Sequence, residues 1–203
     1  QGDLEIFQRK GWQPELTARA RAEWLPRAQA WLRAVEQARP LAAQAESHDK
    51  AKAPALALQA RQQRWALLSG QLAEGHPRRQ AMQAALVDTQ EALGDQLAAA
   101  GRHREAIVHY QAVLQHKRRL HGGKPASGQG ELITPLNDLA RAHRYVGDYP
   151  AALPLFEEAL AIAEAARGPA HPSTGILLNN LAGLYRAMGQ YAKAEPLYVR
   201  ALA

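Results

Sequence analysis

The sequence predicts an all-α protein: a right-handed solenoid of helical hairpins preceded by an N-terminal helical segment. Three observations lead to this prediction. Strong helix formers dominate the composition, a segment of the chain repeats after 42 residues, and apolar residues recur at helical spacing within each copy. The chain has 203 residues and only two Phe, and it is rich in Ala, Leu, Gln, Arg and Glu, which favours helix over strand.

The internal repeat defines the organisation. Residues 136–160 (LNDLARAHRYVGDYPAALPLFEEAL) and 178–202 (LNNLAGLYRAMGQYAKAEPLYVRAL) align without a gap at an offset of 42, and a weaker copy over 93–114 lies 46 residues before its counterpart. The four additional residues fall in the Gly-rich connection 122–130, where a stacked array tolerates insertions. We therefore expect an N-terminal helical segment over 1–80 and repeats over 81–203, at about 86–131, 132–173 and 174–203, the last truncated.

Each copy is predicted to form two helices. Gly189 ends the first helix of the last copy, because Gly accepts the left-handed conformation of a helix end. Pro196 lies in the first turn of the second helix, where a missing N–H costs little. Ser173 is expected to cap the helix that follows the break at 171–173. Small residues let the paired helices approach closely, and they are Ala140, Ala152, Ala182 and Ala194.

The N-terminal third is also predicted to be helical. Helices are expected over 14–46, with a kink or break at Pro40, and over 55–73 and 78–100, with a turn at 47–50. All four Trp lie in this third, at positions 12, 24, 31 and 65. They form either a core between helices that cap the array, which we favour, or an exposed aromatic patch for a partner.

The repeat resembles the tetratricopeptide repeat. The last copy carries that family's order of small and aromatic residues at Leu181, Ala182, Tyr185, Gly189, Ala194, Tyr198 and Ala201. The 42-residue period and the connector over 168–172 resemble the kinesin-light-chain type, which extends the usual 34-residue unit. The resemblance covers about residues 86–203. It implies a hairpin solenoid that binds peptides or proteins, and it does not imply kinesin. The Ala- and Arg-rich composition suggests a bacterial source.

In this repeat type the first helix of each hairpin lines a concave groove, so the resemblance also implies a ligand site. The expected groove residues are Asn137, Arg141, Arg144, Tyr145, Ile176, Asn179, Gly183 and Arg186, with Asp88, Glu91 and Asp95 from the first copy. An Asn amide donates and accepts at once and suits a peptide backbone, whereas Arg suits acidic groups. Alternatively, Asn179 and Asn180 are family residues that bond within their own hairpin.

No catalytic or cofactor motif is present, so we expect no enzyme, cofactor or metal. Gly122, Gly123 and Lys124 lack the spacing of a phosphate loop, and there is no Cys. The four His between 103 and 121 are spaced poorly for a common metal. The basic run at 116–119 is better explained as a helix end, where cations complement the helix dipole, than as a phosphate contact.

The leading hypothesis is an interaction scaffold that binds a protein or peptide of unknown identity in the groove. One alternative is the regulatory or sensor region of a larger protein whose effector domain is absent here. Nucleic-acid binding is a lesser alternative. It is supported only by the formal net charge, which is +5 over 1–80 and +1 over 81–203. We expect no membrane span and possible end-to-end self-association. The chain begins with Gln rather than Met. Further repeats are expected after residue 203 in the full-length protein. A soluble cytoplasmic protein is favoured over export with a removed signal peptide.

Overall fold

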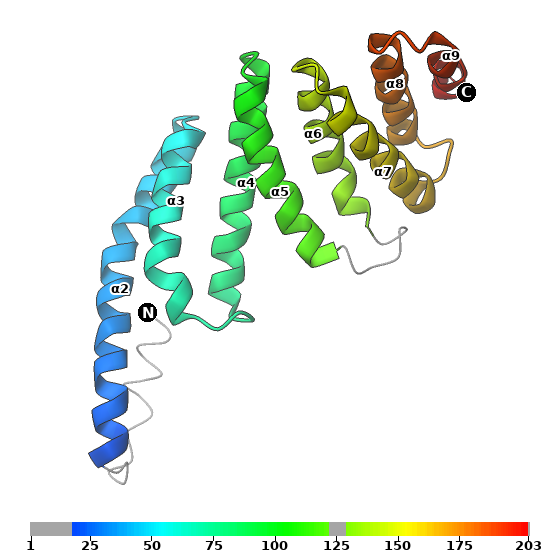
Figure 1. The fold of residues 1–203 in the computed structure, drawn as a ribbon. Helices are drawn as coiled ribbons and strands as arrows, with labels where there is room; N and C mark the ends of the chain where they lie inside the picture. The colour runs from blue at the N-terminus through cyan, green and yellow to red at the C-terminus, as the bar shows by residue number, and fades with distance from the viewer. Residues whose placement is uncertain (1–17, 122–128, 203) are drawn as a thin grey trace.

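Consecutive antiparallel helices stack side by side along the chain (Figure 1). The computed structural model describes residues 18–121 and 129–202, with side chains from residue 26 onward, and every regular element in these ranges is helical. The helices are α2 (Ala18–Lys50), α3 (Pro54–Leu68), α4 (Pro77–Ala99), α5 (His103–His121), α6 (Ile133–Tyr145), α7 (Tyr149–Arg167), α8 (Pro172–Ala187) and α9 (Tyr191–Leu202), with the 3-10 turns η1 (Ser69–Gln71) and η3 (Gly130–Leu132). The predicted all-α solenoid is confirmed.

Three hairpins correspond to the three sequence copies: α4 with α5, α6 with α7, and α8 with α9. The first helix of each hairpin is closed by a glycine with positive φ, which is +76° at Gly101, +81° at Gly147 and +73° at Gly189. After each glycine, the next amide donates to a carbonyl five residues back, as Gln190 does to Tyr185 at 2.8 Å. This closure is a Schellman-type helix end, which favours glycine because it has no Cβ.

The start of α8 differs from the sequence prediction. His171, not Ser173, caps the helix, and its Nδ1 accepts the amide N–H of Ser173 at 3.1 Å. Pro172 occupies the first helical position. A residue before proline is held in the extended region, which is also the N-cap conformation. Pro172 therefore helps to place His171 in the conformation that caps the helix. His76 caps α4 in the same way, ahead of Pro77.

The predicted break at Pro40 and the predicted turn at 47–50 are absent; a kink at Pro40 stays a prediction. α2 runs unbroken from Ala18 to Lys50, and the chain turns only at 51–53, where Lys52 has a φ of +53°. Pro40 is exposed, so its ring meets solvent rather than a packed neighbour. The opposite side of α2 buries a row of alanines at 34, 38 and 45, in a helix that packs along α3, and this packing outweighs one missing backbone hydrogen bond.

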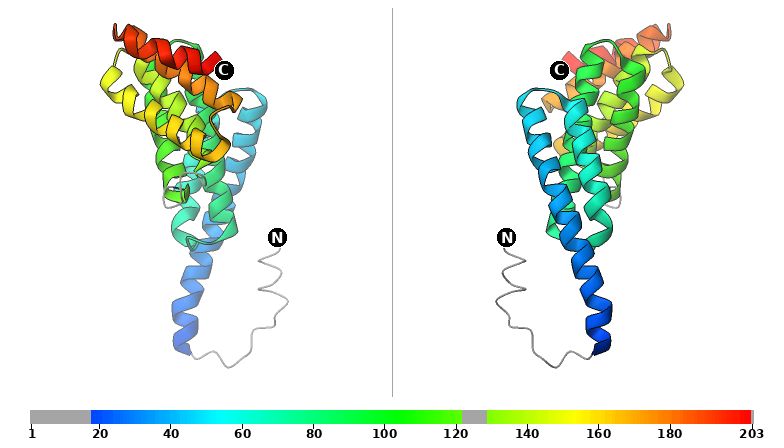
Figure 2. Two further views of the ribbon diagram at one scale, coloured as in Figure 1. Left: turned by 90° about the vertical axis from the view of Figure 1, so that its right-hand side faces the viewer. Right: turned by 90° about the vertical axis from the view of Figure 1, so that its left-hand side faces the viewer.

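The N-terminal pair α2 and α3 continues the stack rather than standing apart. Figures 1 and 2 show that the N-terminal half of α2 extends beyond the other helices. Trp65 packs against a small core of Ala34, Ala38, Leu68 and Met82, beneath the guanidinium of Arg79 at 5.6 Å. Trp31 is half-buried beside the same core, and the side chains of Trp12 and Trp24 lie outside the described residues. The predicted boundary at residue 80 remains a prediction.

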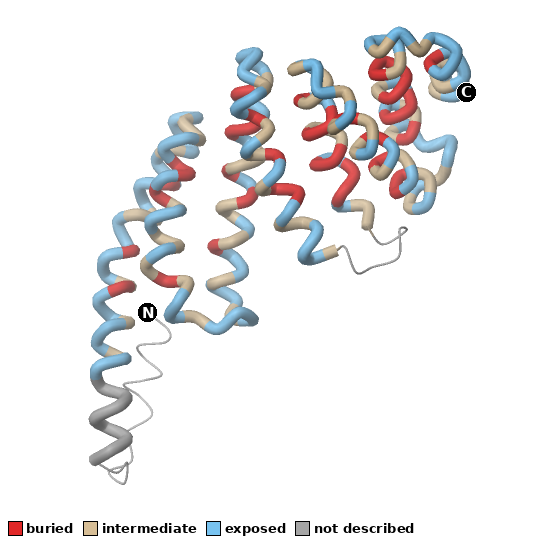
Figure 3. The backbone as a smooth tube through the Cα atoms, in the orientation of Figure 1, coloured by how far each residue is buried: buried red, intermediate tan, exposed pale blue. Residues whose placement is uncertain are grey.

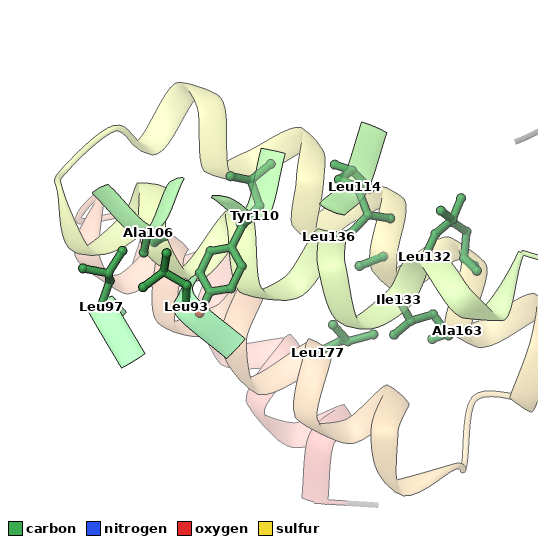
Figure 4. Packing of buried hydrophobic residues seen from close by; sticks show 14 of the residues in the cluster. Leu93, Leu97, Ala106, Tyr110, Leu114, Leu132, Ile133, Leu136, Ala163 and Leu177 are labelled. Atoms are coloured by element: carbon green, nitrogen blue, oxygen red, sulfur yellow. The ribbon is translucent and has the colours of Figure 1, made fainter. Parts of the chain in front are cut away.

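The largest cluster of buried hydrophobic residues runs through the hairpins (Figures 3 and 4). It begins at Leu58 in α3, passes Tyr110 in α5 and Leu136 in α6, and ends at Leu177 in α8. The small residues predicted from the repeat are buried where helices meet, and Ala140, Ala152 and Ala182 are fully inaccessible to solvent. Residues of neighbouring hairpins share this cluster, so the hairpins bury one another's apolar sides.

Candidate ligand groove

The surface formed by α4, α6 and α8 is the inner face of the array. On this face α6 and α8 touch directly, through a hydrogen bond from Asn180 Nδ2 to Asn137 Oδ1 at 2.8 Å. On the opposite side, a cleft of about 580 Å³ lies between α5 and α7 and reaches down to Leu139 and His143 of α6. The ion pair between Arg118 and Glu158 joins α5 to α7. The groove predicted from the resemblance lies on the side of α4, α6 and α8, and it remains a prediction.

The two predicted groove asparagines differ in their surroundings. Asn137 is half-buried; its carbonyl accepts from Asn180 and its Nδ2 donates to Asp138 Oδ1 at 3.3 Å. Asn179 is exposed. The alternative that Asn180 bonds within its own hairpin is not what the structure has, because its amide links two successive hairpins. Asn137 thus holds the groove wall together, while Asn179 is the more accessible of the pair.

Arg144 and Tyr145 form a layered contact at the junction of the hairpins. The Tyr145 ring stacks on His103, with centroids 4.4 Å apart and planes at 9°. The Arg144 guanidinium carbon lies 5.1 Å from the Tyr145 ring centroid. The same guanidinium lies close to Gly183 of α8, where an added Cβ would come within 2.8 Å of Arg144 Nη1. Gly183 therefore leaves room for the Arg144 guanidinium because it has no side chain.

A recess of about 450 Å³ opens on the inner face between α4 and α6; we call it the α4–α6 recess. Its lining includes Asp95, Tyr110, Asp138, Arg141 and Tyr145. The Tyr110 hydroxyl donates to Asp95 Oδ1 at 2.8 Å, and burial together with that carboxylate raises the pKa of Tyr110. Tyr110 therefore remains a protonated donor.

Asp138 is the most perturbed carboxylate of the α4–α6 recess. Burial raises the pKa of Asp138 to about 6, and the nearby Asp95 and Glu91 add to the shift. Arg141 and the amide of Asn137 act in the opposite direction but do not cancel it. Arg141 Nη1 is 3.5 Å from Asp138 Oδ1, a long contact from a side chain that is 47% exposed. The recess thus holds more negative charge than Arg141 neutralises.

The remaining predicted residues lie farther along α8. Ile176 and Asn179 line an open cleft of about 700 Å³ between α8 and α9, together with Tyr198 and Leu202. Ile176 is 59% exposed, and Arg186 is exposed near the end of α8.

The structure thus brings three of the eight predicted groove residues together at the α6–α8 junction, and they are Asn137, Arg144 and Gly183. Arg141 and Tyr145 line the α4–α6 recess, and the other three lie outward on α8.

Sequence reasoning missed four residues of this face: His103, Tyr110, Asp138 and Asn180. Asp138 and Asn180 occupy the same position of two successive copies, 42 residues apart, directly after the predicted asparagines. This matching position in the repeat was the signal in the sequence that could have identified both residues. His103 and Tyr110 come from α5, the second helix of its hairpin, so a rule that looks only at first helices omits them.

Comparison with known proteins bears on the repeat fold. Residues 131–203 match the tetratricopeptide repeat family. These residues are tetratricopeptide repeats. No curated protein matches the chain. Within the described part of the tetratricopeptide array and the helices before it, no helix is long and apolar enough to cross a membrane.

Solved structures extend the likeness to the N-terminal helices. A Podosopora anserina protein described as a kinesin light chain with nearly identical TPR-like repeats is 22% identical, with a TM-score of 0.52, over 98% of this chain and 81% of its own. BtubC (BKLC) from P. vanneervenii is also 22% identical, with a TM-score of 0.53, over 87% of this chain and 70% of its own. Identity at this level shows a common fold. The predicted kinesin-light-chain-like solenoid is confirmed, and a bacterial source stays a prediction.

Proposed function

We propose that this chain is an interaction scaffold whose inner face binds an extended or helical segment of a partner protein. Tetratricopeptide repeats generally mediate protein–protein interactions and typically act without catalysis, and we assign this chain no reaction. The proposal concerns where the segment lies and which groups hold it: Asn179 with its backbone, and Arg144 and Arg186 with its acidic groups.

The state of Arg144 is the observation that carries the proposal. Arg144 is half-buried, its guanidinium rests on Tyr145, and it has no carboxylate partner among the described side chains of residues 26–121 and 129–202. A guanidinium fixed in place has already lost much of its rotamer freedom, so less entropy is lost when it binds an anion. A planar fork of this kind suits a carboxylate of the bound segment.

Asn179 and Ile176 support a binding path that continues along α8. Both face the cleft shared with α9, and an amide beside an exposed apolar side chain can serve the backbone and a side chain of one segment. Arg186 adds a second cation near the end of the same helix. In contrast, Asn137 is already bonded on both sides, so we assign it to the wall rather than to the ligand.

A peptide library displayed on phage tests the proposal without a known partner. Peptides selected on the wild-type chain should be enriched in Asp or Glu and should lose at least tenfold in affinity for the Arg144→Glu, Arg186→Glu double variant. Each lost charge-assisted hydrogen bond is worth about 1.5–3 kcal/mol. The matched control is Arg104→Glu with Arg119→Glu, two exposed arginines on α5. Equal losses in both double variants, or none in either, would refute the assignment.

A further inference from the structure

Two ion pairs on the outer side of the array converge on α7. Arg118 of α5 pairs with Glu158, and Arg200 of α9 pairs with Glu164 at 2.6 Å. α7 therefore supplies the carboxylate to both of its neighbours, through two glutamates that lie within two turns of one another. These four side chains, which we call the α7 clasp, join the three hairpins of the repeat array.

The two ion pairs occupy equivalent positions of the repeat, with the charges exchanged. Glu158 and Arg200 are counterparts at the offset of 42, and Arg118 and Glu164 are counterparts at the offset of 46. Each pair therefore joins the later position of one second helix to the earlier position of the next. A contact of α9 with α5 in the same register would place Arg200 against Arg118, and like charges disfavour that order of hairpins.

The first ion pair spans a gap that packing leaves open. α6 packs against both α5 and α7, and the cleft of about 580 Å³ opens between these two helices above α6. Arg118 lines this cleft, so its pair with Glu158 ties the two walls together. The same relation holds at the next joint, where α8 packs against both α7 and α9 while Arg200 and Glu164 link the two outer helices.

We propose that the α7 clasp is an ionic-strength-dependent device that holds α5, α7 and α9 at a fixed separation. The four side chains are 35% to 50% exposed, so dissolved salt reaches both ion pairs. The screening length falls from about 10 Å at 0.1 M to about 3 Å at 1 M ionic strength. An exposed ion pair changes an equilibrium constant by up to about fivefold. That is enough to shift the balance between a closed and a wider outer cleft, and too little to decide whether the chain folds.

None of these side chains lies on the inner face, so the α7 clasp is separate from the proposed ligand site. Its effect there is indirect. α6 and α8 carry Arg144 and Arg186, and α7 packs against both of these helices. A wider outer cleft would change the distance between groups that one bound segment must reach. Salt would then weaken binding in two ways, by screening the charges of the ligand and by loosening the clasp.

Paired nitroxide labels measure the two separations independently, since the chain contains no Cys. One pair joins Val108→Cys on α5 to Ala161→Cys on α7, and the other joins Ala161→Cys to Ala192→Cys on α9, all at exposed positions. Pulsed electron double resonance gives the distribution of distances for each pair. With no other change to the chain, both distributions should move to longer distances as NaCl is raised from about 0.05 M to about 1 M.

Charge variants assign each movement to one ion pair. Arg118→Glu should lengthen the α5–α7 distance at low salt and leave the α7–α9 distance unchanged, and Arg200→Glu should do the reverse. Arg118→Glu combined with Glu158→Arg should restore the original α5–α7 distance. Arg102→Glu is the matched control, because Arg102 pairs locally with Glu105 at the start of α5. The proposal is overturned by distances that ignore both salt and Arg118→Glu, by an exchange that behaves like the single variant, or by equal shifts of both label pairs in Arg118→Glu. Peptide binding enters none of these measurements, so the proposed function holds or fails separately.

Discussion

Asp138 and Asn180 occupy the same position in successive repeats, yet one is charged and the other is neutral. Asn180 uses its amide to bridge two hairpins, while Asp138 is a largely buried carboxylate near Asp95 and Glu91. The ionised Asp138 carboxylate therefore destabilises the native state at neutral pH. Strongly perturbed carboxylates in a cleft are typical of functional sites.

Asp138→Asn should stabilise the protein above pH 6 and change little near pH 4. The folded pKa of about 6 lies above the ordinary 3.8, so the native state binds more protons than the unfolded chain between these values. The free energy of unfolding of the wild type therefore falls as pH rises through this window, by on the order of 2 kcal/mol from this group. Thermal unfolding of both proteins from pH 4 to pH 7.5 measures the difference. A variant less stable than the wild type at pH 7.5 would contradict the account.

Gly94→Ala should destabilise the first hairpin through Tyr110. An added Cβ would lie 2.7 Å from Tyr110 Cε1 and 3.0 Å from Cδ1, so the ring must move and its hydroxyl would leave Asp95. Overpacking of this kind costs about 1–3 kcal/mol, and Ala regains up to about 1 kcal/mol of helix propensity. A double-mutant cycle with Tyr110→Leu, measured by urea unfolding, should show favourable coupling. Additive effects would mean that the ring does not restrict this position.

At the scale of elements, most of the fold followed from the sequence because the information is local or repeated. The offset of 42 located α6 to α9, and Gly189 marked a real helix end. The errors were also local. Pro40 was given the effect it has in an isolated helix, although α2 gains more from packing on α3 than the ring removes.

The site was less predictable than the fold. Position within the repeat pointed to Arg144 and Tyr145, but not to their neighbours. The contacts of Gly183 with Arg144 and of His103 with Tyr145 depend on the twist between successive hairpins, which no single repeat encodes. The same is true of Asn180, whose partner lies 43 residues earlier.

Arg61 joins the N-terminal pair of helices to the repeats. Its guanidinium on α3 pairs with Asp49 of α2 and donates to the buried Thr89 hydroxyl of α4, which in turn donates to the Ala85 carbonyl at 2.6 Å. Arg61→Ala should loosen this junction by about 1–3 kcal/mol, because it leaves partly buried groups unpaired.

Fluorescence makes the Arg61 prediction specific, since all four Trp lie in the N-terminal third. In urea, the midpoint detected by Trp emission should fall further than the midpoint detected by circular dichroism, which reports every hairpin. Arg33→Ala is the control, because the one hydrogen bond of the Arg33 side chain within the described residues goes to the Gln29 carbonyl of its own helix. An unchanged Trp midpoint in Arg61→Ala would rule out this role.

For the whole molecule, the inner-face helices carry charges of both signs. α4 contributes Glu91 and Asp95, α6 contributes Asp138 and Arg144, and α8 contributes Arg186. A solenoid places these groups on successive helices at a regular spacing, so a single segment can meet them in order. The central claim is therefore about a face: partners lie on α4, α6 and α8 and not on α5, α7 and α9.

Photo-crosslinking from either face tests that claim most directly. A benzophenone amino acid is placed at Asn179 on the inner face or at Gln115, an exposed residue lining the outer cleft. Each labelled protein is irradiated with the same phage-selected peptide, and the crosslinked product is measured by mass spectrometry. The account predicts a crosslink from position 179 and little from position 115. Efficient crosslinking from 115 with none from 179 would contradict it.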